Sequence, residues 1–167
     1  KYILEIDENN EHAYYGTGLA YFELHEYQKA VEYLTQAILL NPNNSTTYFL
    51  IAEAYKNLEK KKQALESYKM CIEIDSENGE AHFELGKIYE SIFKISEALD
   101  EYFIAKKHIE ADELNFNYGV LLYSIEEFSE ALSPLRSYII NNPFDFDILI
   151  ILGEIFFKEN RYSEAID

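Results

Sequence analysis

Apolar and small residues along the chain recur at the spacing of an amphipathic helix. One stripe follows the intervals i, i+3, i+4, i+7 and i+10, and a second stripe begins a few residues later. Such spacing places side chains on one face of a helix. Because only a short polar stretch separates the two stripes, we predict an antiparallel pair of helices. The first stripe is Tyr14, Thr17, Gly18, Tyr21 and Leu24, and the second is Ala30, Leu34, Ala37 and Ile38.

The same pattern returns along the chain with a period close to 34 residues. One column holds Gly18, Ala52, Gly86, Gly119 and Gly153, and a second column holds Ala30, Ala64, Ala98, Ala131 and Ala165. A glycine inside a helix costs about 1 kcal/mol relative to alanine. We therefore expect the glycine column to lie where two helices cross closely, because a larger side chain would not fit there.

The period predicts a single array of helix pairs. Its units are expected at 11–44, 45–78, 79–111, 112–145 and 146–167, the last one truncated, with 1–10 as the end of a preceding unit. One pair of helices cannot bury all its aromatic residues, so stacking the next pair buries them. We expect exposed apolar surface at both ends of the array, which is compatible with end-to-end self-association.

The pattern read across the units is aromatic-x-x-x-Gly-x-x-Tyr, then Ala, a large residue, Ala and Pro. The first unit has Tyr14, Gly18, Tyr21, Ala30, Leu34, Ala37 and Pro42 at these positions. This pattern resembles the tetratricopeptide repeat family, and the resemblance covers essentially the whole chain. It implies an all-α fold, a right-handed α-solenoid or superhelix of antiparallel helix pairs.

Two units depart from the pattern. The third is one residue short, with Glu110 and Ala111 in place of the proline turn, and we expect a changed rotation between units three and four. In the fourth, Tyr138 stands in a small-residue position and Leu122 replaces a tyrosine, which we interpret as a volume-conserving exchange in the core. Pro134 predicts a kink or a delayed start of the second helix, and a bend for partner docking is the alternative.

The net charge of −17 narrows the classes of partner. Nonspecific nucleic-acid binding needs basic side chains to displace counterions, and anionic membranes repel an acidic surface. No stretch reaches the ~18 apolar residues that membrane insertion requires. Protein or peptide partners with apolar or basic surfaces remain, and the cytoplasm is the default compartment.

No motif for catalysis, cofactor binding or metal binding is recognisable, so we predict that the chain is not an enzyme. His82 falls in the aromatic core column and Cys71 in an alanine position, and we interpret both as packing residues. The acidic run Glu73, Asp75, Glu77 and Glu80 lacks the glycine and the ligand spacing of a calcium loop, which favours a solvated charge run.

The family resemblance implies that the first helix of each pair lines a concave groove that binds extended peptides or helices. One column of this groove is aromatic in four units and aliphatic in the fifth. These side chains are either anchors for a ligand or packing residues between neighbouring first helices, and the two roles can coexist. The candidate residues are Tyr15, Leu19, Phe22, Phe49, Glu53, Phe83, Glu84, Lys87, Phe116, Asn117, Tyr123, Ile150 and Glu154.

Charges on the same helices favour a ligand with basic flanks. The acids are Glu23, Glu53, Glu80, Glu84, Glu90, Glu113, Asp147 and Glu154, against the lysines Lys56, Lys87 and Lys158. Two family subtypes do not fit. The clamp for a C-terminal carboxylate would need basic or amide residues at Tyr15, Leu19, Leu50, Glu80 and Glu84. The asparagine ladder of sugar-transferring solenoids would occupy Gly16, Leu50, Glu84, Asn117 and Ile151, of which one is asparagine.

The leading hypothesis is a protein–protein interaction module that binds a peptide or helix segment, apolar with basic flanks, in the concave groove. Two alternatives stay open at this point. One is a structural scaffold or spacer segment of a larger assembly. The other is the non-catalytic arm of a multidomain enzyme.

Overall fold

The computed structural model describes residues 10–162, and within this range it contains nine α-helices and no strand. The all-helical prediction is therefore confirmed. The prediction that 1–10 is the end of a preceding unit rests on residues of which only Asn10 is described, and Ala165 of the alanine column also lies outside the described residues. The helices are α1 (Glu11–Glu23), α2 (Tyr27–Leu40), α3 (Ser45–Asn57), α4 (Lys61–Ile74), α5 (Gly79–Ser91), α6 (Ile95–His108), α7 (Asp112–Ser124), α8 (Phe128–Asn141) and α9 (Phe146–Lys158).

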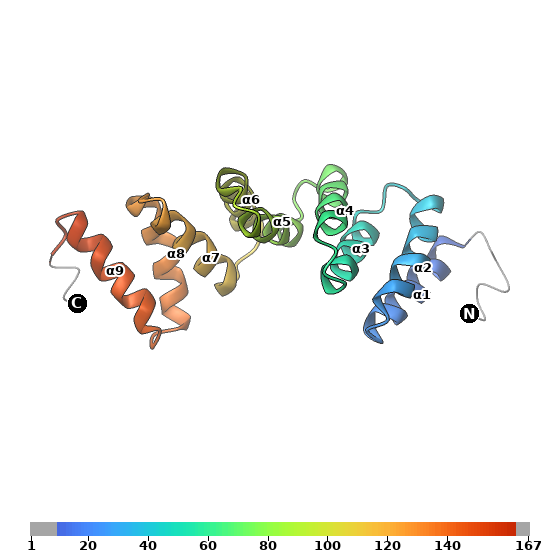
Figure 1. The fold of residues 1–167 in the computed structure, drawn as a ribbon, viewed down its shortest axis with the longest axis horizontal. Coiled ribbons are helices and arrows are strands. Elements are labelled where there is room, and N and C mark those ends of the chain that lie inside the picture. Colours follow the sequence, from blue (N-terminus) through green and yellow to red (C-terminus); the bar gives the residue numbers. More distant parts are fainter. Residues whose placement is uncertain (1–9, 163–167) are drawn as a thin grey trace. The chain divides into compact units, whose positions relative to one another are not determined.

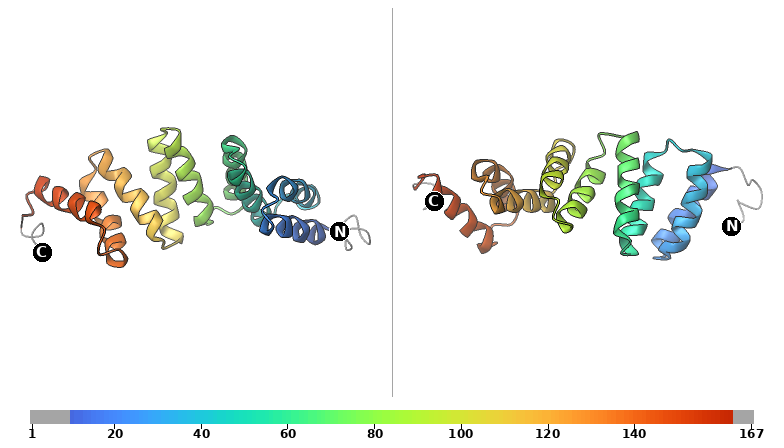
Figure 2. Two further views of the ribbon diagram at one scale, coloured as in Figure 1. Left: turned by 60° about the horizontal axis from the view of Figure 1, so that its bottom comes forward. Right: turned by 45° about the horizontal axis from the view of Figure 1, so that its top comes forward.

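The chain forms two compact units that are each larger than one repeat, a first unit at Lys1–Ile88 and a second unit at Tyr89–Asp167, and α5 runs across their boundary. In the first unit α1 packs on α2, α2 on α3, and α3 on α4. In the second unit α6 packs on α7, α7 on α8, and α8 on α9. Helices such as α1 and α2, or α7 and α8, lie side by side as antiparallel hairpins (Figure 1 and Figure 2). The predicted pairing of helices is thus confirmed, whereas the division into repeats stays a prediction.

Each first helix ends in the same kind of three-residue turn. In the turn after α1, the Glu26 N–H donates to the Tyr21 carbonyl and the His25 N–H to the Phe22 carbonyl, both at 2.9 Å. These bonds satisfy carbonyls at the helix end. The middle residue takes a left-handed conformation, with φ between 58° and 67°, at His25, Glu59, Phe93, Glu126 and Asn160. The backbone therefore reverses direction in the same way although no glycine stands at these positions.

Asparagine or aspartate caps the start of most first helices. The side chains of Asn10, Asn44, Asn78 and Asp145 accept a hydrogen bond from the backbone N–H three residues later, at 2.9–3.2 Å. Ala111 stands before α7 and provides no such cap. The turn 109–111 has three residues where the other turns between hairpins have four. The predicted one-residue deletion therefore shortens this turn and removes the cap, while the changed rotation stays a prediction.

Two of the glycines lie where helices cross closely, as predicted. A Cβ added to Gly18 would be 2.6 Å from Leu34 Cγ, and one added to Gly119 would be 2.6 Å from Leu135 Cδ2. Both distances are too short for carbon atoms, so a larger residue would push the hairpin apart. At Gly153 an added Cβ would meet nothing within 4 Å among the described residues.

The unusual residues of the sequence pack inside their units. His82 is buried and its Nε2 lies 3.3 Å from the Ser76 carbonyl, and Cys71 is fully buried, so both packing interpretations are confirmed. Burial raises the pKa of the Cys71 thiol to about 11. Leu122 and Tyr138 pack in the same core cluster, as the volume exchange requires.

The prediction that Pro134 delays the start of its helix is wrong. Helix α8 begins at Phe128 and continues through Pro134, which is buried. The start is instead determined by the three-residue turn before it, whose Glu127 N–H donates to the Leu122 carbonyl at 3.0 Å. The buried side chains Ala131 and Leu135 hold the helix in place on both sides of the proline.

Candidate functional site

In the first unit, α1 contributes an apolar surface. Tyr15, Leu19 and Phe22 are each half-buried. Tyr15 and Phe22 pack against the core cluster around Leu34. The Phe22 ring meets the Tyr27 ring edge-on, with centroids 5.4 Å apart. This part of the predicted groove is therefore anchored by the core and keeps part of its apolar area accessible.

Helices α3 and α5 bring four charged side chains together. Lys56 Nζ lies 2.7 Å from one Glu53 carboxylate oxygen and 3.0 Å from a Glu84 oxygen, and so links the two helices. Lys87 Nζ lies 2.7 Å from the other oxygen of Glu84. Two acids and two lysines thus alternate. The acid excess that the residue count suggests is balanced at this point of the face.

A buried tyrosine supports this charge cluster from the second helix of its hairpin. The Tyr68 hydroxyl donates a hydrogen bond to the Glu53 carboxylate. Its ring meets Phe49 edge-on at 5.8 Å. Burial, followed by the neighbouring Glu53 charge, raises the pKa of Tyr68. Sequence analysis missed this role. The signal for it was a tyrosine where the first hairpin has Leu34, because a buried hydroxyl needs a partner.

The aromatic column was assigned two alternative roles, ligand contact and packing between helices, and Phe83 has the packing role. It is 7% exposed, so little of its ring can touch a ligand. Lys87 Nζ lies 4.5 Å from its ring centroid, a cation–π distance. Phe49 is half-buried and stays available as a contact.

In the second unit, the candidates from α7 and α9 are brought together only in part. The Tyr123 hydroxyl donates to the Glu154 carboxylate, and this bond raises the pKa of Tyr123. The Phe116 ring instead turns to Tyr138, 5.2 Å away, and Asn117 is half-buried on the same helix. Ile150 is 59% exposed.

The acids of this second face have fewer cationic partners. Lys158, one helical turn after Glu154, lies over the Phe128 ring, 4.6 Å from its centroid. Among residues 10–162, no lysine or arginine pairs with Glu154 or with Asp147. Negative charge is thus less compensated here than on the face of the first unit.

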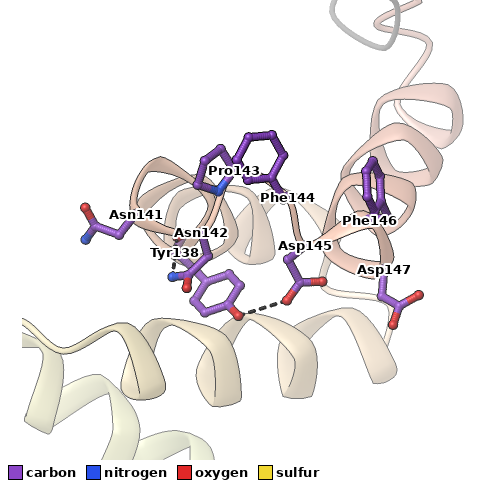
Figure 3. Close-up of a pocket in the computed structure, with 8 residues that line it drawn as sticks. All are labelled: Tyr138, Asn141, Asn142, Pro143, Phe144, Asp145, Phe146 and Asp147. Carbon is purple, nitrogen blue, oxygen red and sulfur yellow. Dashed lines mark hydrogen bonds between the residues drawn. The ribbon is translucent and has the colours of Figure 1, made fainter.

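An open pocket of about 690 Å³ lies at the turn between α8 and α9. In Figure 3 the rings of Phe144 and Phe146 point to one side of the turn and the carboxylates of Asp145 and Asp147 to the other. Sequence analysis did not identify it. Its lining residues are Tyr138, Asn141, Asn142, Pro143, Phe144, Asp145, Phe146 and Asp147.

Two properties of the described part of the chain bear on chemistry. Over residues 10–162, no group of three or more His, Cys, Asp or Glu side chains is arranged to hold a metal ion. No helix in the same range is both long and apolar enough to cross a bilayer.

Family models for the tetratricopeptide repeat match this sequence three times, at residues 12–44, 45–78 and 119–167. Together these matches cover most of the chain. The part between them, 79–118, includes the shortened turn. No curated protein matches the sequence.

Several solved structures share the fold. YrrB, a TPR protein with an unusual peptide-binding site, has 20% identity and a TM-score of 0.83, over 98% of this chain and 84% of YrrB. A MamA structure has 18% identity and a TM-score of 0.76, over 84% of this chain and 83% of that one. PilF of Pseudomonas aeruginosa has 20% identity and a TM-score of 0.68, over 95% and 72%.

At such identities these likenesses show the fold, which is the all-α solenoid fold of tetratricopeptide proteins. Proteins built from these repeats are generally non-catalytic and act as protein-interaction modules. With the repeat matches and the paired helices in agreement, the chain belongs to the tetratricopeptide repeat family.

Proposed function

We propose that this chain binds a peptide or helix segment along the faces formed by its first helices, with apolar residues of the ligand on the aromatic column and basic residues beside it. The observation that carries the proposal is the combination of accessible apolar side chains with acids on the same helices. Half-buried Tyr15 and Phe49 represent it in the first unit, and exposed Ile150 with Glu154 represents it in the second.

The two faces differ in the kind of ligand that each would favour. On the first, the paired charges of Glu53, Lys56, Glu84 and Lys87 leave apolar contact as the main source of affinity. On the second, the less compensated Glu154 and Asp147 favour lysine or arginine. A likeness in fold to YrrB, described as having an unusual peptide-binding site, is compatible with this proposal.

Selection of peptides from a random displayed library, with the 167-residue chain as bait, tests the proposal. Phe49→Ala combined with Ile150→Ala removes one apolar contact from each face and spares the buried Phe83. We expect the selected peptides to contain apolar residues near lysine or arginine, and the double variant to bind them at least about tenfold more weakly, a loss of about 1.4 kcal/mol.

Phe93→Asn is the matched control, because Phe93 is an exposed aromatic residue at the turn after α5. Far-UV circular dichroism and urea unfolding show whether each variant keeps its fold. If the folded double variant bound every selected peptide as tightly as the Phe93→Asn control, the proposed faces would not be the binding site.

A further inference from the structure

The turn that leads into α9 differs in chemistry from the corresponding turns of the chain. The segment Pro143–Phe146 stands where the turn before α3 has Pro42–Ser45. Phe144 thus replaces Asn43, and Phe146 replaces Ser45. Before α5 the same two positions hold Glu77 and Gly79. Two aromatic residues therefore occupy positions that carry polar or small residues in these other turns.

Packing does not account for these two rings. Phe144 is 83% exposed and Phe146 is 68% exposed. Within the described residues, neither ring stacks on another aromatic ring or lies under a cationic side chain. Exposed phenylalanine rings keep apolar area in water at a cost of about 25 cal/mol per Å². Exposed apolar area of this kind marks interaction sites on folded proteins.

The carboxylates on the other side of the turn give the pocket a negative charge. One Asp145 oxygen accepts a hydrogen bond from the Tyr138 hydroxyl at 2.8 Å (Figure 3), and the other accepts from the Ile148 N–H at 3.2 Å. Asp147 is exposed, and no hydrogen bond or ion pair of its side chain is found among the described residues. No lysine or arginine lines the pocket. Its fixed charge is therefore uncompensated by the residues around it.

We propose that the pocket at the α8–α9 turn is a docking site for a partner protein segment that presents arginine or lysine next to an apolar residue. The rings of Phe144 and Phe146 would hold the apolar residue on their side of the turn. Asp147, with Asp145 beside it, would bind the charged head of the basic residue on the other side. Asp145 is held in position because it also caps α9 and accepts the Tyr138 bond.

Charge complementarity decides between the occupants that such a surface could take. A second copy of the chain would bring another net charge of −17 to an acidic pocket. Like charges across an interface cost several kcal/mol. A purely apolar segment would leave the Asp147 carboxylate beside it without a partner. A basic segment satisfies both the rings and the carboxylates. This site shares Asp147 with the second of the first-helix faces proposed above, but its two rings belong to neither face.

The test uses the 167-residue chain and a Gly-Ser peptide with a central Arg-Leu-Arg, compared with the same peptide carrying Glu-Leu-Glu. Binding is followed by the shifts of backbone amide NMR signals. We expect the signals of 142–147 to shift with the Arg-Leu-Arg peptide and to stay in place with the other. We also expect the affinity to fall as salt rises from about 50 mM to about 500 mM, because the carboxylates are exposed to solvent.

Phe144→Asn with Phe146→Ser gives this turn the residues of the turn before α3, so the fold is retained. It is expected to weaken binding by at least about tenfold, and Asp147→Asn by about threefold. Phe93→Asn, the matched exposed-ring control, should leave the affinity unchanged. The proposal is overturned if the double variant binds as the parent does, if Glu-Leu-Glu binds equally, or if the signals of 142–147 move only on self-association.

These outcomes are separable from those of the first proposal. If Phe144→Asn with Phe146→Ser loses the Arg-Leu-Arg peptide and keeps the library-selected peptides, the pocket is supported and the faces are untouched. If the Phe49 and Ile150 variant loses the library-selected peptides and the Arg-Leu-Arg peptide still binds the parent and both double variants equally, the faces are supported and the pocket is overturned.

Discussion

The hairpins α1–α2 and α3–α4 have different side chains at the point where their two helices cross. In the first, Gly18 makes room for Leu34, and the contact is apolar throughout. In the second, the corresponding residues are Ala52 and Tyr68, both fully buried. The Tyr68 hydroxyl donates a hydrogen bond to Glu53 of α3, one of the candidate groove residues. Corresponding positions thus lie at the crossing in both hairpins, but only in α3–α4 does a hydrogen bond link the buried residue, Tyr68, to a surface residue, Glu53.

A buried position of the repeat can thus determine the chemistry of the exposed face. Glu53 is held by Tyr68 and by Lys56, which also pairs with Glu84. A hydrogen bond to a charged group contributes about 1.5–3 kcal/mol. No comparable link leaves Leu34, because leucine has no polar atom. The surface of α3 therefore carries a charge cluster that is tied to the core, which the surface of α1 lacks.

The largest expected effect concerns the thiol in the interior of the α3–α4 hairpin. Cys71 stands where the α1–α2 hairpin has Ala37, and burial raises its pKa from its ordinary value of 9.0 to about 11. At pH 8 the thiolate fraction is about a hundredfold lower than for an unperturbed thiol, so labelling by a disulfide reagent should be slower by at least about that factor. Absorbance of the released thiol measures the rate, and the urea-unfolded chain is the control.

The same shift predicts the sign of a pH effect. Because the folded pKa is raised, the neutral thiol contributes stability that is complete below pH 9.0 and is lost as the pH rises towards about 11. Cys71→Ala should lack this part of the fall in unfolding free energy. Rapid labelling of the folded chain at pH 8 would show that the hairpin interior is open.

The next-largest expected effect is on the free energy of unfolding, which alanine at two glycines of α1 should change in opposite directions. Gly18→Ala should lower the free energy of unfolding by about 2 kcal/mol, because the new Cβ meets Leu34 side-chain atoms at 2.6 and 2.8 Å and its backbone nitrogen at 3.2 Å. Gly16→Ala, where the added Cβ meets nothing within 4 Å, should raise it by up to about 1 kcal/mol.

Urea unfolding followed by circular dichroism measures both variants, and Gly16→Ala is the matched control for helix propensity. If the two substitutions changed stability in the same direction, the close crossing of α1 and α2 would not be the reason for the glycine.

The smallest expected effect tests the polar link itself. Tyr68→Phe keeps the ring at the crossing and removes the hydroxyl that Glu53 accepts, so the unfolding free energy should fall by about 1–2 kcal/mol. Tyr102→Phe is the corresponding change in the second unit, where the Tyr102 hydroxyl donates to Glu90 at 2.7 Å, and should give a loss of similar size. Equal stability of Tyr68→Phe and the parent chain would mean that the core does not support the charge cluster.

Much of the fold could be predicted from the sequence because it depends on local periodicity. The stripes through Tyr14 and Ala30 predicted the first hairpin, and the column through Gly18 and Gly119 predicted close crossings that the structure contains. The start of α8 could not be predicted from Pro134 alone. Packing on both sides of the proline and the turn before the helix decide it, and both are tertiary features.

The candidate site was predictable only as a set of positions. Sequence analysis placed Glu53 and Glu84 on first helices, but the link between them through Lys56 requires two helices at a particular distance. The same applies to the burial of Phe83, which stands in the column that also holds accessible Ile150. Repetition shows which positions correspond to one another, and it leaves open how much of each side chain the neighbouring helices cover.

By itself the sequence determined an acidic, all-helical repeat chain of the tetratricopeptide family, since helix periodicity and small-residue spacing act within and between adjacent hairpins. Only the tertiary structure decided that Tyr68 supports Glu53, that Lys56 joins Glu53 to Glu84, and that no other element covers Phe144 and Phe146 among the described residues. Those properties depend on which helices pack against each side chain, and packing is not fixed by the order of residues within one helix.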